Sequence, residues 1–355
     1  MRIQDLGYND HFKKSKTEKN LEGLEVGRVI AEHKERYIVK NEKGEFEAEI
    51  TGNLRFSANG RNDFPAVGDW VVLITHDSGL ALIHSILPRL SVLSRQAVKK
   101  FGERQIIACN IDYTLIVQSV NRDFNINRLE RYLTLCHTSK IKPIIVVSKT
   151  DLTNEQHLND LLGKINSRIK NVPVIHLSNE TQIGVDKLKK LLYKGKTYCL
   201  LGSSGVGKSS LINSLLGENR MKTDTISESV DRGKHITTYR ELIPLVNGAL
   251  LIDNPGMREV GIADSSGGLE STFQKIHDLS QDCRFSDCTH TSERDCAVKL
   301  AIENGEIDAS YFQNYLKLER EKEHYESTVA EKRRKDKDFG KMIKRYKKTR
   351  KSNKH

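Results

Sequence analysis

One short stretch of the sequence carries the residue types of a phosphate-binding loop. It runs GSSGVGKS and matches the pattern G-x-x-x-x-G-K-[ST]. Its glycines let backbone N–H groups turn toward an anion, its lysine supplies a cation for β- and γ-phosphates, and its last hydroxyl can ligate Mg²⁺. An apolar predicted strand precedes it and a predicted helix follows, which disfavours a chance glycine-rich turn. The expected nucleotide contacts are Gly202, Ser203, Ser204, Gly205, Val206, Gly207, Lys208, Ser209 and Ser210, and Lys208 is also a candidate catalytic residue.

A second motif, DNPG, ends the apolar run ALLI downstream of this loop. An acid at the end of a buried strand can hold Mg²⁺ through water, and a glycine N–H can bond the γ-phosphate. An ordinary Asn-Pro-Gly turn after a strand is the alternative. The position after the phosphate loop favours nucleotide binding by Asp253 and Gly256.

A third motif, SKTD, ends another buried apolar run, IIVV, and precedes the phosphate loop. The Asp151 carboxylate can accept two hydrogen bonds, from guanine N1–H and from the exocyclic amine, whereas adenine offers no such donor pair. The stem of Lys149 can lie along the base. A backbone amide after VPVIHL could reach guanine O6, although that signal is weak by itself. The expected guanine contacts are Ser148, Lys149, Thr150, Asp151 and Ser178.

The order of the motifs is unusual, because the base loop comes before the phosphate loop. Strands alternate with helices over about 150 residues here, which predicts a doubly wound parallel sheet. Ligand loops of such sheets lie at the carboxyl ends of the strands, whatever the order in which the strands are made. Joining the original termini and opening the chain elsewhere therefore preserves the site. The order predicts a circularly permuted domain.

The chain before this domain predicts a different architecture. From about residue 24 to 93, short apolar segments are separated by glycine and proline. This spacing suits a small β-barrel, for which the oligonucleotide-binding (OB) fold is our first expectation and a generic barrel the alternative. Trp70, in PAVGDW, is interpreted as a core residue rather than a platform for stacking bases.

Four metal-ligating side chains fall within fourteen residues near the other end of the chain: Cys283, Cys288, His290 and Cys296. Three thiolates and an imidazole complete a tetrahedron and leave no open position, which is typical of structural zinc. Four unrelated residues are the alternative. The remaining three cysteines lie in strand or helix patterns and are interpreted as buried thiols.

The net charge of +11 is concentrated at the C-terminal end. From residue 330 onward, thirteen Lys and Arg stand against three acids, which gives +10 and leaves the rest of the chain close to neutral. Such tails commonly meet nucleic acid, and a merely solvated tail is the alternative. No apolar run of about 18 residues and no export-signal pattern is present, so we expect a cytoplasmic protein without membrane association.

In this order the motifs resemble those of the RsgA family of circularly permuted GTPases. The resemblance covers almost the whole chain and rests on LGYND, PAVGDW, SKTD, GSSGVGKSS, RGKHITTYREL, DNPGMRE and the Cys/His cluster. It implies an N-terminal extension and OB-like barrel at 1–95, a circularly permuted GTPase domain at 96–265, and a helical zinc-binding domain with the basic tail at 266–355.

The resemblance also implies what the protein does. The expectation is a GTP hydrolase that assists late maturation of the small ribosomal subunit, binds its rRNA and is activated by it. Implied ligands are GTP or GDP, Mg²⁺ and one structural Zn²⁺, for a monomer. The alternative is a nucleotide-regulated RNA-binding scaffold without significant turnover. Asp151 argues against a third reading, an ATPase or small-molecule kinase.

Two departures from the family pattern bear on the nucleotide. Ser148 stands where the base loop usually begins with Asn, which predicts weaker nucleotide binding with guanine preference retained through Asp151. The usual three threonines of switch I are here Ile-Thr-Thr. The expected Mg²⁺ ligands are Ser209, Thr238 and Asp253, with Thr237 as the alternative to Thr238.

The residue that handles the attacking water is the least defined part of the site. Met257 occupies the position after the DNPG motif, where many GTPases carry a water-orienting Gln, so we expect a slow intrinsic rate. His235 is the candidate to orient water, because a neutral imidazole can accept its proton. An RNA-binding or solvent-facing histidine is the alternative.

Overall fold

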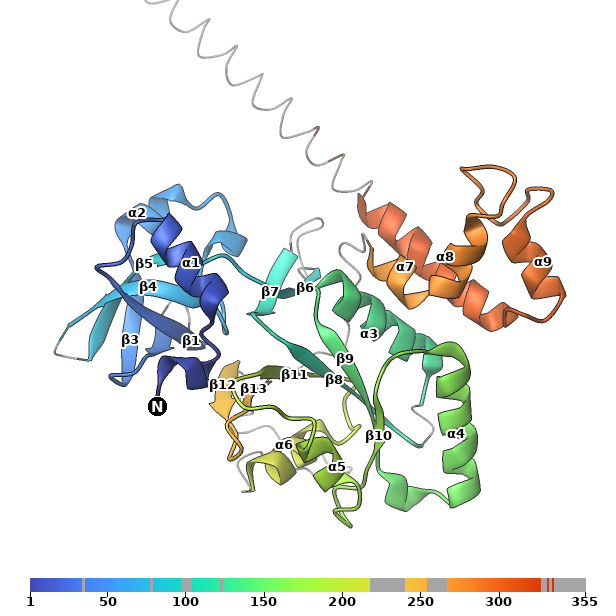
Figure 1. The fold of residues 1–355 in the computed structure, drawn as a ribbon, viewed down its shortest axis with the longest axis horizontal. Coiled ribbons are helices and arrows are strands. Elements are labelled where there is room, and N and C mark those ends of the chain that lie inside the picture. The colour runs from blue at the N-terminus through green and yellow to red at the C-terminus, as the bar shows by residue number, and fades with distance from the viewer. Residues whose placement is uncertain are drawn as a thin grey trace, which may run out of the picture.

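The computed structural model describes residues 1–33, 36–76, 79–96, 104–121, 124–217, 240–253 and 267–326, with 331 and 334. A barrel, an α/β region and a helical module follow one another along the chain (Figure 1). No helix in these ranges is long and apolar enough to cross a membrane. Several predicted features lie outside the described residues: His235, Thr237, Thr238, Gly256, Met257 and nearly all of the basic tail.

The N-terminal barrel has five strands and closes on itself. The strand order is β1-β2-β3-β5-β4, and β4 pairs back with β1. Buried and exposed residues alternate along β3 and β5, because one face of each strand lines the barrel core. The strand order and closure confirm the predicted OB-like barrel. The strands are β1 (Glu25–His33), β2 (Arg36–Lys40), β3 (Glu45–Ile50), β4 (Trp70–Thr75) and β5 (Leu80–Ile86).

Helical segments that the sequence did not predict complete the barrel. They are a 3-10 turn η1 (Ile3–Leu6), α1 (Asp10–Glu18), α2 (Gly52–Ser57) and a short 3-10 turn η2 (Arg61–Asp63). The rings of Tyr8 and Phe12 lie 5.0 and 5.7 Å from that of Trp70. Trp70 is fully buried, which confirms its interpretation as a core residue.

A buried arginine joins the N-terminal segment, the barrel and the next region. Arg28 donates hydrogen bonds to the carbonyl oxygens of Leu6, Gly68 and Asn110. Burial lowers the pKa of Arg28 to about 10, which still leaves the guanidinium charged at neutral pH. Because its partners lie on three segments far apart in sequence, this one side chain fixes their relative positions.

The central region is a mostly parallel sheet in the order β10-β9-β8-β11-β13-β12, with β12 antiparallel at one edge. Apolar side chains fill both faces: α3 and α4 cover one, and α5 and α6 cover the other. The predicted doubly wound sheet is confirmed. Its strands are β8 (Tyr113–Ser119), β9 (Lys142–Ser148), β10 (Val174–His176), β11 (Thr197–Leu201), β12 (Glu241–Pro244) and β13 (Leu250–Asp253). Its helices are α3 (Ile126–Thr138), α4 (Glu155–Arg168), α5 (Val185–Lys189) and α6 (Lys208–Leu216).

The barrel and the central sheet are physically continuous. An antiparallel pair, β6 (Val92–Gln96) and β7 (Arg104–Cys109), lies between them in sequence, and β1 pairs with β12 at Ala31 and Glu241. The boundary predicted at residue 95 falls at the end of β6 and stays a prediction. Neither strand of this pair was predicted from the sequence.

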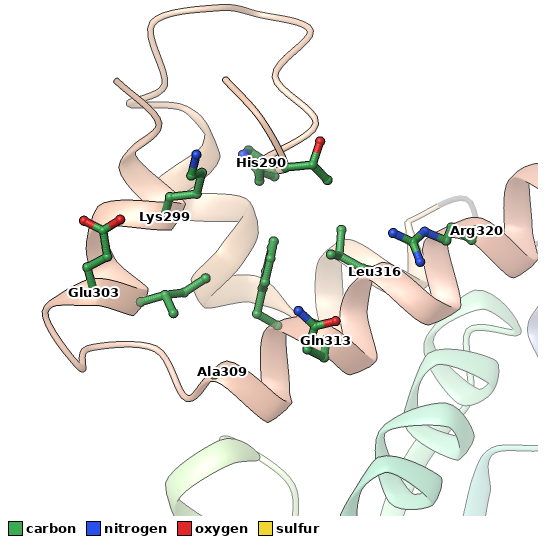
Figure 2. Close-up of a pocket in the computed structure, with 10 residues that line it drawn as sticks. His290, Lys299, Glu303, Ala309, Gln313, Leu316 and Arg320 are labelled. Atoms are coloured by element: carbon green, nitrogen blue, oxygen red, sulfur yellow. The ribbon is translucent and has the colours of Figure 1, made fainter. Parts of the chain in front are cut away.

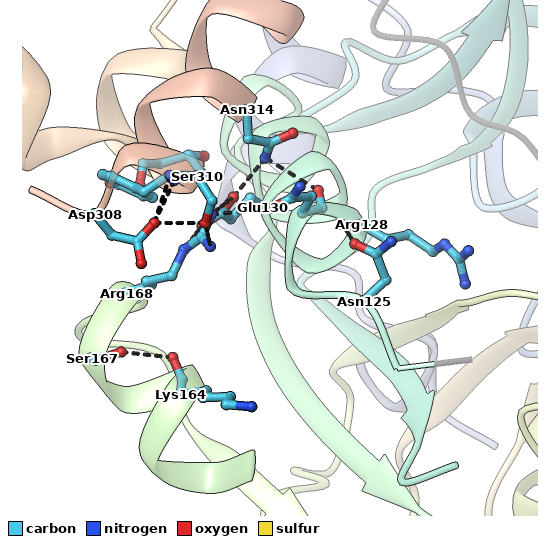
Figure 3. A network of polar contacts seen from close by, with 12 residues as sticks. Asn125, Arg128, Glu130, Lys164, Ser167, Arg168, Asp308, Ser310 and Asn314 are labelled. Carbon is cyan, nitrogen blue, oxygen red and sulfur yellow. Dashed lines mark hydrogen bonds and ion pairs between the residues drawn. The ribbon is translucent and has the colours of Figure 1, made fainter. Parts of the chain in front are cut away.

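The helical module has its own apolar core and is fastened to α3. It comprises α7 (Gly268–Thr272), α8 (Gln274–Ser280), α9 (Ala297–Glu303) and a helix at 309–326. Glu130 on α3 is fully buried and accepts hydrogen bonds from Arg168 at 2.8 Å and from Asn314 of the module (Figure 3). Arg131 makes a bidentate pair with Glu321 at 2.8 and 2.6 Å. Arg168, which ends α4, also donates a hydrogen bond to the Ser310 hydroxyl at 3.0 Å, so both α3 and α4 hold the module.

The PAVGDW motif forms a tight corner that requires its glycine. Gly68 has φ +92°, and a Cβ placed there would lie 2.1 Å from the carbonyl oxygen of Cys109. The buried Asp69 carboxylate accepts hydrogen bonds from the backbone N–H of Ala66 at 2.8 Å and from Arg89 at 2.7 Å. The motif therefore serves to seat the barrel against β7.

We predict that Gly68→Ala destabilises the barrel more than Gly79→Ala does. Both glycines have positive φ, which costs an alanine about 1–2 kcal/mol, but only Gly68 faces a carbonyl while Gly79 faces open space. Urea unfolding followed by the fluorescence of Trp70, the single tryptophan of the chain, measures the difference. Equal losses would show that the contact with Cys109 carries no energetic weight.

Candidate functional site

The glycine loop lies where β11 ends and α6 begins. Gly202, Gly205 and Gly207 have φ of +154, +79 and +89°, and a Cβ on Gly202 would lie 2.4 Å from the carbonyl oxygen of Val117. The ammonium of Lys208 donates hydrogen bonds to the carbonyl oxygens of Gly202, at 2.8 Å, and Ser203, so it lies across the loop. Together with the N–H groups that begin α6, this backbone forms an anion-binding nest.

The base loop begins where β9 ends, at Ser148. Lys149 adopts φ +59°, and Asp151 lies in the short 3-10 turn η3 (Thr150–Leu152) that follows. The hydroxyl of Ser178 donates a hydrogen bond to Oδ1 of Asp151 and accepts one from the backbone N–H of Thr181 at 3.2 Å. Ser178 is fully buried, so it holds one oxygen of the carboxylate in a fixed direction. This side-chain role was not predicted, since Ser178 was expected to act through its backbone.

The two loops contact each other directly. The Ser148 hydroxyl lies 2.7 Å from the carbonyl oxygen of Val206 in the phosphate loop and donates to it. Nδ2 of Asn179 donates to the carbonyl oxygen of Gly207 at 3.3 Å, and a Cβ on Gly207 would lie 4.0 Å from Cε of Lys149. The base loop and the phosphate loop thus form one site, with dimensions set by side chain-to-backbone contacts.

The acidic motif lies at the same edge of the sheet. Asp253 ends β13, which pairs in parallel with β11, the strand that leads into the phosphate loop. Parallel strands present their carboxyl ends together, so Asp253 and Ser209 belong to one edge. The other residues expected around the γ-phosphate and Mg²⁺ lie outside the described chain, and their assignment stays a prediction.

The structure adds an arginine that sequence reasoning missed. Arg128, in the first turn of α3, donates a hydrogen bond to the Ser203 hydroxyl at 2.8 Å. Tyr132, one turn later, also contacts Ser203, and burial raises the pKa of this phenol. No motif marks Arg128, because its contact depends on how α3 packs beside the phosphate loop.

The Cys/His residues come together as the spacing predicted. The ligand atoms of Cys283, Cys288, His290 and Cys296 all lie within 4.8 Å of one another. Sγ of Cys283 is 3.8 Å from that of Cys296, and Nδ1 of His290 is 3.6 and 3.4 Å from these two sulfurs. A tetrahedral zinc site with Zn–S bonds of about 2.3 Å has edges of about 3.8 Å. The cluster therefore has the size and donor set of a metal site.

The ionisation of the cluster also suits a cation. Burial opposes ionisation of Cys283, but the backbone N–H groups of Val298 and Ala297 outweigh it and lower the pKa of this thiol. The pKa of Cys288 is raised to about 11 by burial and by the neighbouring sulfurs. Burial lowers the pKa of His290, which favours the neutral imidazole that a metal needs. Three thiolates this close repel one another unless a cation lies between them.

A pocket of about 390 Å³ lies beside this cluster, with His290 in its wall (Figure 2). The helix at 309–326 forms much of the opposite wall, and Lys299, Glu303 and Arg320 contribute charged groups of both signs. The pocket belongs to the helical module, and none of its lining residues is a predicted nucleotide contact.

The fold and the joined loops define a P-loop nucleotide-binding domain with a permuted strand order. The family model described as RsgA GTPase matches residues 86–263. A model described as ABC transporter matches residues 185–351, a range that contains the glycine loop shared by many P-loop proteins.

Relatives over most of the chain agree with the first match. The small ribosomal subunit biogenesis GTPase RsgA 2 of Lactiplantibacillus plantarum is 46% identical over 84% of each chain. RsgA 1 of Bacteroides thetaiotaomicron is 38% identical over 96% of each. The crystal structure of YjeQ from Thermotoga maritima superposes with a TM-score of 0.66 at 27% identity, covering 84% of this chain and 98% of that one. YloQ, a circularly permuted GTPase, gives a TM-score of 0.62 at 25% identity, covering 85% and 96%.

The chain belongs to the RsgA GTPase family, and it is a GTP hydrolase. The predicted family, fold class and enzyme class are confirmed. The roles of individual nucleotide-binding residues and the two boundaries between the three domains stay predictions.

We predict that Asp151→Asn weakens GDP binding by at least about 100-fold, because the amide cannot accept both guanine donors in place of the carboxylate. In the wild type, GTP should displace a fluorescent GDP analogue far better than ATP does. Asp160→Asn is the matched control, since Asp160 is exposed on α4. Competition titrations measure both effects. Equal displacement by ATP and GTP would contradict the guanine assignment.

Proposed function

We propose that this GTPase assists late maturation of the small ribosomal subunit, binds its rRNA and is activated by it. Nucleotide binding is supported by the direct contact between the base loop and the phosphate loop, in which Ser148 donates to the carbonyl oxygen of Val206. The role in small-subunit maturation is supported by the relatives, which are named for small-subunit biogenesis and match over most of this chain and of their own. We propose a monomer that acts in the cytoplasm.

The proposed nucleotide contacts follow from the two loops. Asp151, oriented by Ser178, reads guanine, and the stem of Lys149 covers the base. The glycine loop and Lys208 hold the phosphates. Mg²⁺, carried with GTP, would be held by Ser209, Thr238 and Asp253 and would neutralise charge on the phosphates. Gly256 would bond the γ-phosphate, and His235 would orient the attacking water.

The proposed metal in the Cys/His cluster is zinc. Three thiolates and one imidazole at the corners of a tetrahedron match zinc in donor type, number and spacing. A set without an open position supplies folding energy rather than catalysis. The core around it is small, so the metal would stabilise the loop between α8 and α9.

Charge indicates which parts of the chain meet RNA. In residues 267–326, seven Lys and Arg stand against thirteen Asp and Glu, a net charge of −6, whereas residues 330–355 carry +10. The helical module is therefore a poor counterpart for phosphates, and the tail and the barrel are the better candidates.

A second proposal is that the chain acts mainly as a nucleotide-regulated RNA-binding scaffold whose own hydrolysis is slow, and one feature favours it. Met257 cannot orient water, so hydrolysis depends on another group. The two proposals differ in what the small subunit does to the rate, which can be measured directly.

We predict that purified small ribosomal subunits raise the rate of GTP hydrolysis by well over tenfold, because groups supplied in trans commonly complete a GTPase site (on the order of 10³-fold or more). Phosphate release with and without subunits measures the effect. Lys208→Ala should abolish it, and Lys190→Ala, at the exposed lysine that caps the C-terminal end of α5, should not. Undetectable turnover in the presence of subunits would support the scaffold.

We predict that the purified protein contains about one zinc per chain and that Cys296→Ser loses it, because three ligands bind far more weakly than four. Inductively coupled plasma mass spectrometry measures the ratio. Cys136→Ala, at a buried thiol outside the cluster, should keep its zinc. Zinc-free wild-type protein would contradict the assignment.

A further inference from the structure

The side chain of Asn179 lies at the junction of the two nucleotide loops, and no motif gives it a role. Its Nδ2 donates to the carbonyl oxygen of Gly207 at 3.3 Å. A Cβ added to Gly207 would lie 3.3 Å from this nitrogen and 4.0 Å from Cε of Lys149. Asn179 thus stands beside the lysine stem proposed to cover the base and the glycine that precedes the phosphate-binding lysine.

The protein satisfies this amide only in part. Oδ1 of Asn179 is buried and has no hydrogen-bond partner among the described residues. A buried polar atom without a partner costs about 1–3 kcal/mol, so such atoms call for an explanation. A side-chain amide offers two N–H groups and one oxygen, and Gly207 uses one N–H. Of this remaining capacity, the second N–H can donate to an acceptor on a ligand that enters between the loops, whereas Oδ1 needs a donor.

Guanine needs donors that the rest of the site does not supply. Asp151 can accept from N1–H and the exocyclic amine, but O6 and N7 on the opposite edge are both acceptors. Ser148 cannot serve them while it holds the phosphate loop, because its single hydroxyl hydrogen is directed to Val206 at 2.7 Å. A backbone amide in the loop after β10 was expected for O6, which leaves N7 without an assigned donor.

We propose that the side-chain amide of Asn179 donates a hydrogen bond to N7 of the bound guanine while tying the base loop to the phosphate loop. Asn179 would then be a specificity contact of the GTPase site. The proposal rests on guanine nucleotide binding by this chain and adds a residue to it. An Asn at position 148 could both hold the phosphate loop and donate to the base. In this chain Ser148 holds the phosphate loop, and Asn179 supplies the donor to the base.

The experiment compares GDP with 7-deaza-GDP, which lacks the N7 acceptor and is otherwise the same shape. Isothermal titration of the full-length wild type should show about 5–10-fold weaker binding of the 7-deaza compound, the size of one hydrogen bond. Asn179→Ala should bind GDP at least as weakly as the wild type binds 7-deaza-GDP, because it also loses the tie to Gly207, and it should no longer distinguish the two ligands. Thr181→Ala, at an exposed side chain of the same loop, should keep the wild-type ratio.

The ratio of the dissociation constants for 7-deaza-GDP and GDP, measured in each variant, separates recognition of N7 from positioning of the loops. If Asn179 only braced the loops, Asn179→Ala would weaken both ligands and keep the ratio, which would overturn the proposal. Equal binding of both ligands by a wild type that binds GDP tightly would overturn it as well. Wild-type protein that bound neither would instead overturn the nucleotide site itself. The double variant Ser148→Asn/Asn179→Ala should again bind GDP more tightly than 7-deaza-GDP, because the new amide at position 148 could donate to N7.

Discussion

The structure depends on one short contact, the hydrogen bond from the Ser148 hydroxyl to the carbonyl oxygen of Val206. It joins the end of β9 to the loop after β11, two strands separated by β8 in the sheet. The parallel sheet brings both loops to one edge, and this contact sets the distance between the part that reads a base and the part that holds phosphates. Ser148 thus ties the two loops together, and its single hydroxyl hydrogen is then no longer available to the base.

The three regions are held together by buried charge rather than by apolar contact alone. Arg28 joins the N-terminal segment and barrel to the central region through three carbonyl oxygens, and Glu130 joins α3 to α4 through Arg168 and to the helical module through Asn314. Burial raises the pKa of Glu130 while its partners oppose that rise. Because a buried charge without its partner is costly, such contacts fix orientation as well as stability.

Helix α3 stands at the centre of this arrangement. Arg128 in its first turn touches the phosphate loop at Ser203, and Glu130 and Arg131 touch the helix at 309–326. One rigid helix therefore contacts both the nucleotide site and the module that holds the metal cluster. This gives the chain a physical connection between them in addition to the segment that leads from Asp253 to the module.

The sequence by itself determined the local chemistry. The glycine loop, SKTD and the Cys/His spacing each act within a few residues, so their residue types and order sufficed to predict a permuted P-loop domain, a guanine-reading carboxylate and a tetrahedral cluster. Apolar periodicity gave the sheet and the barrel strands. The β6–β7 pair was not predicted, and the short α2 was missed because it has too few residues to show a helical period.

The tertiary structure alone decided which side chains complete the site. Ser178 orients Asp151, Asn179 reaches Gly207, and Arg128 reaches Ser203. The last two pairs join residues 28 and 75 positions apart. Such contacts are set by the register of neighbouring strands and by the packing of a helix against a sheet. Neither can be predicted from the spacing of residues within a short motif.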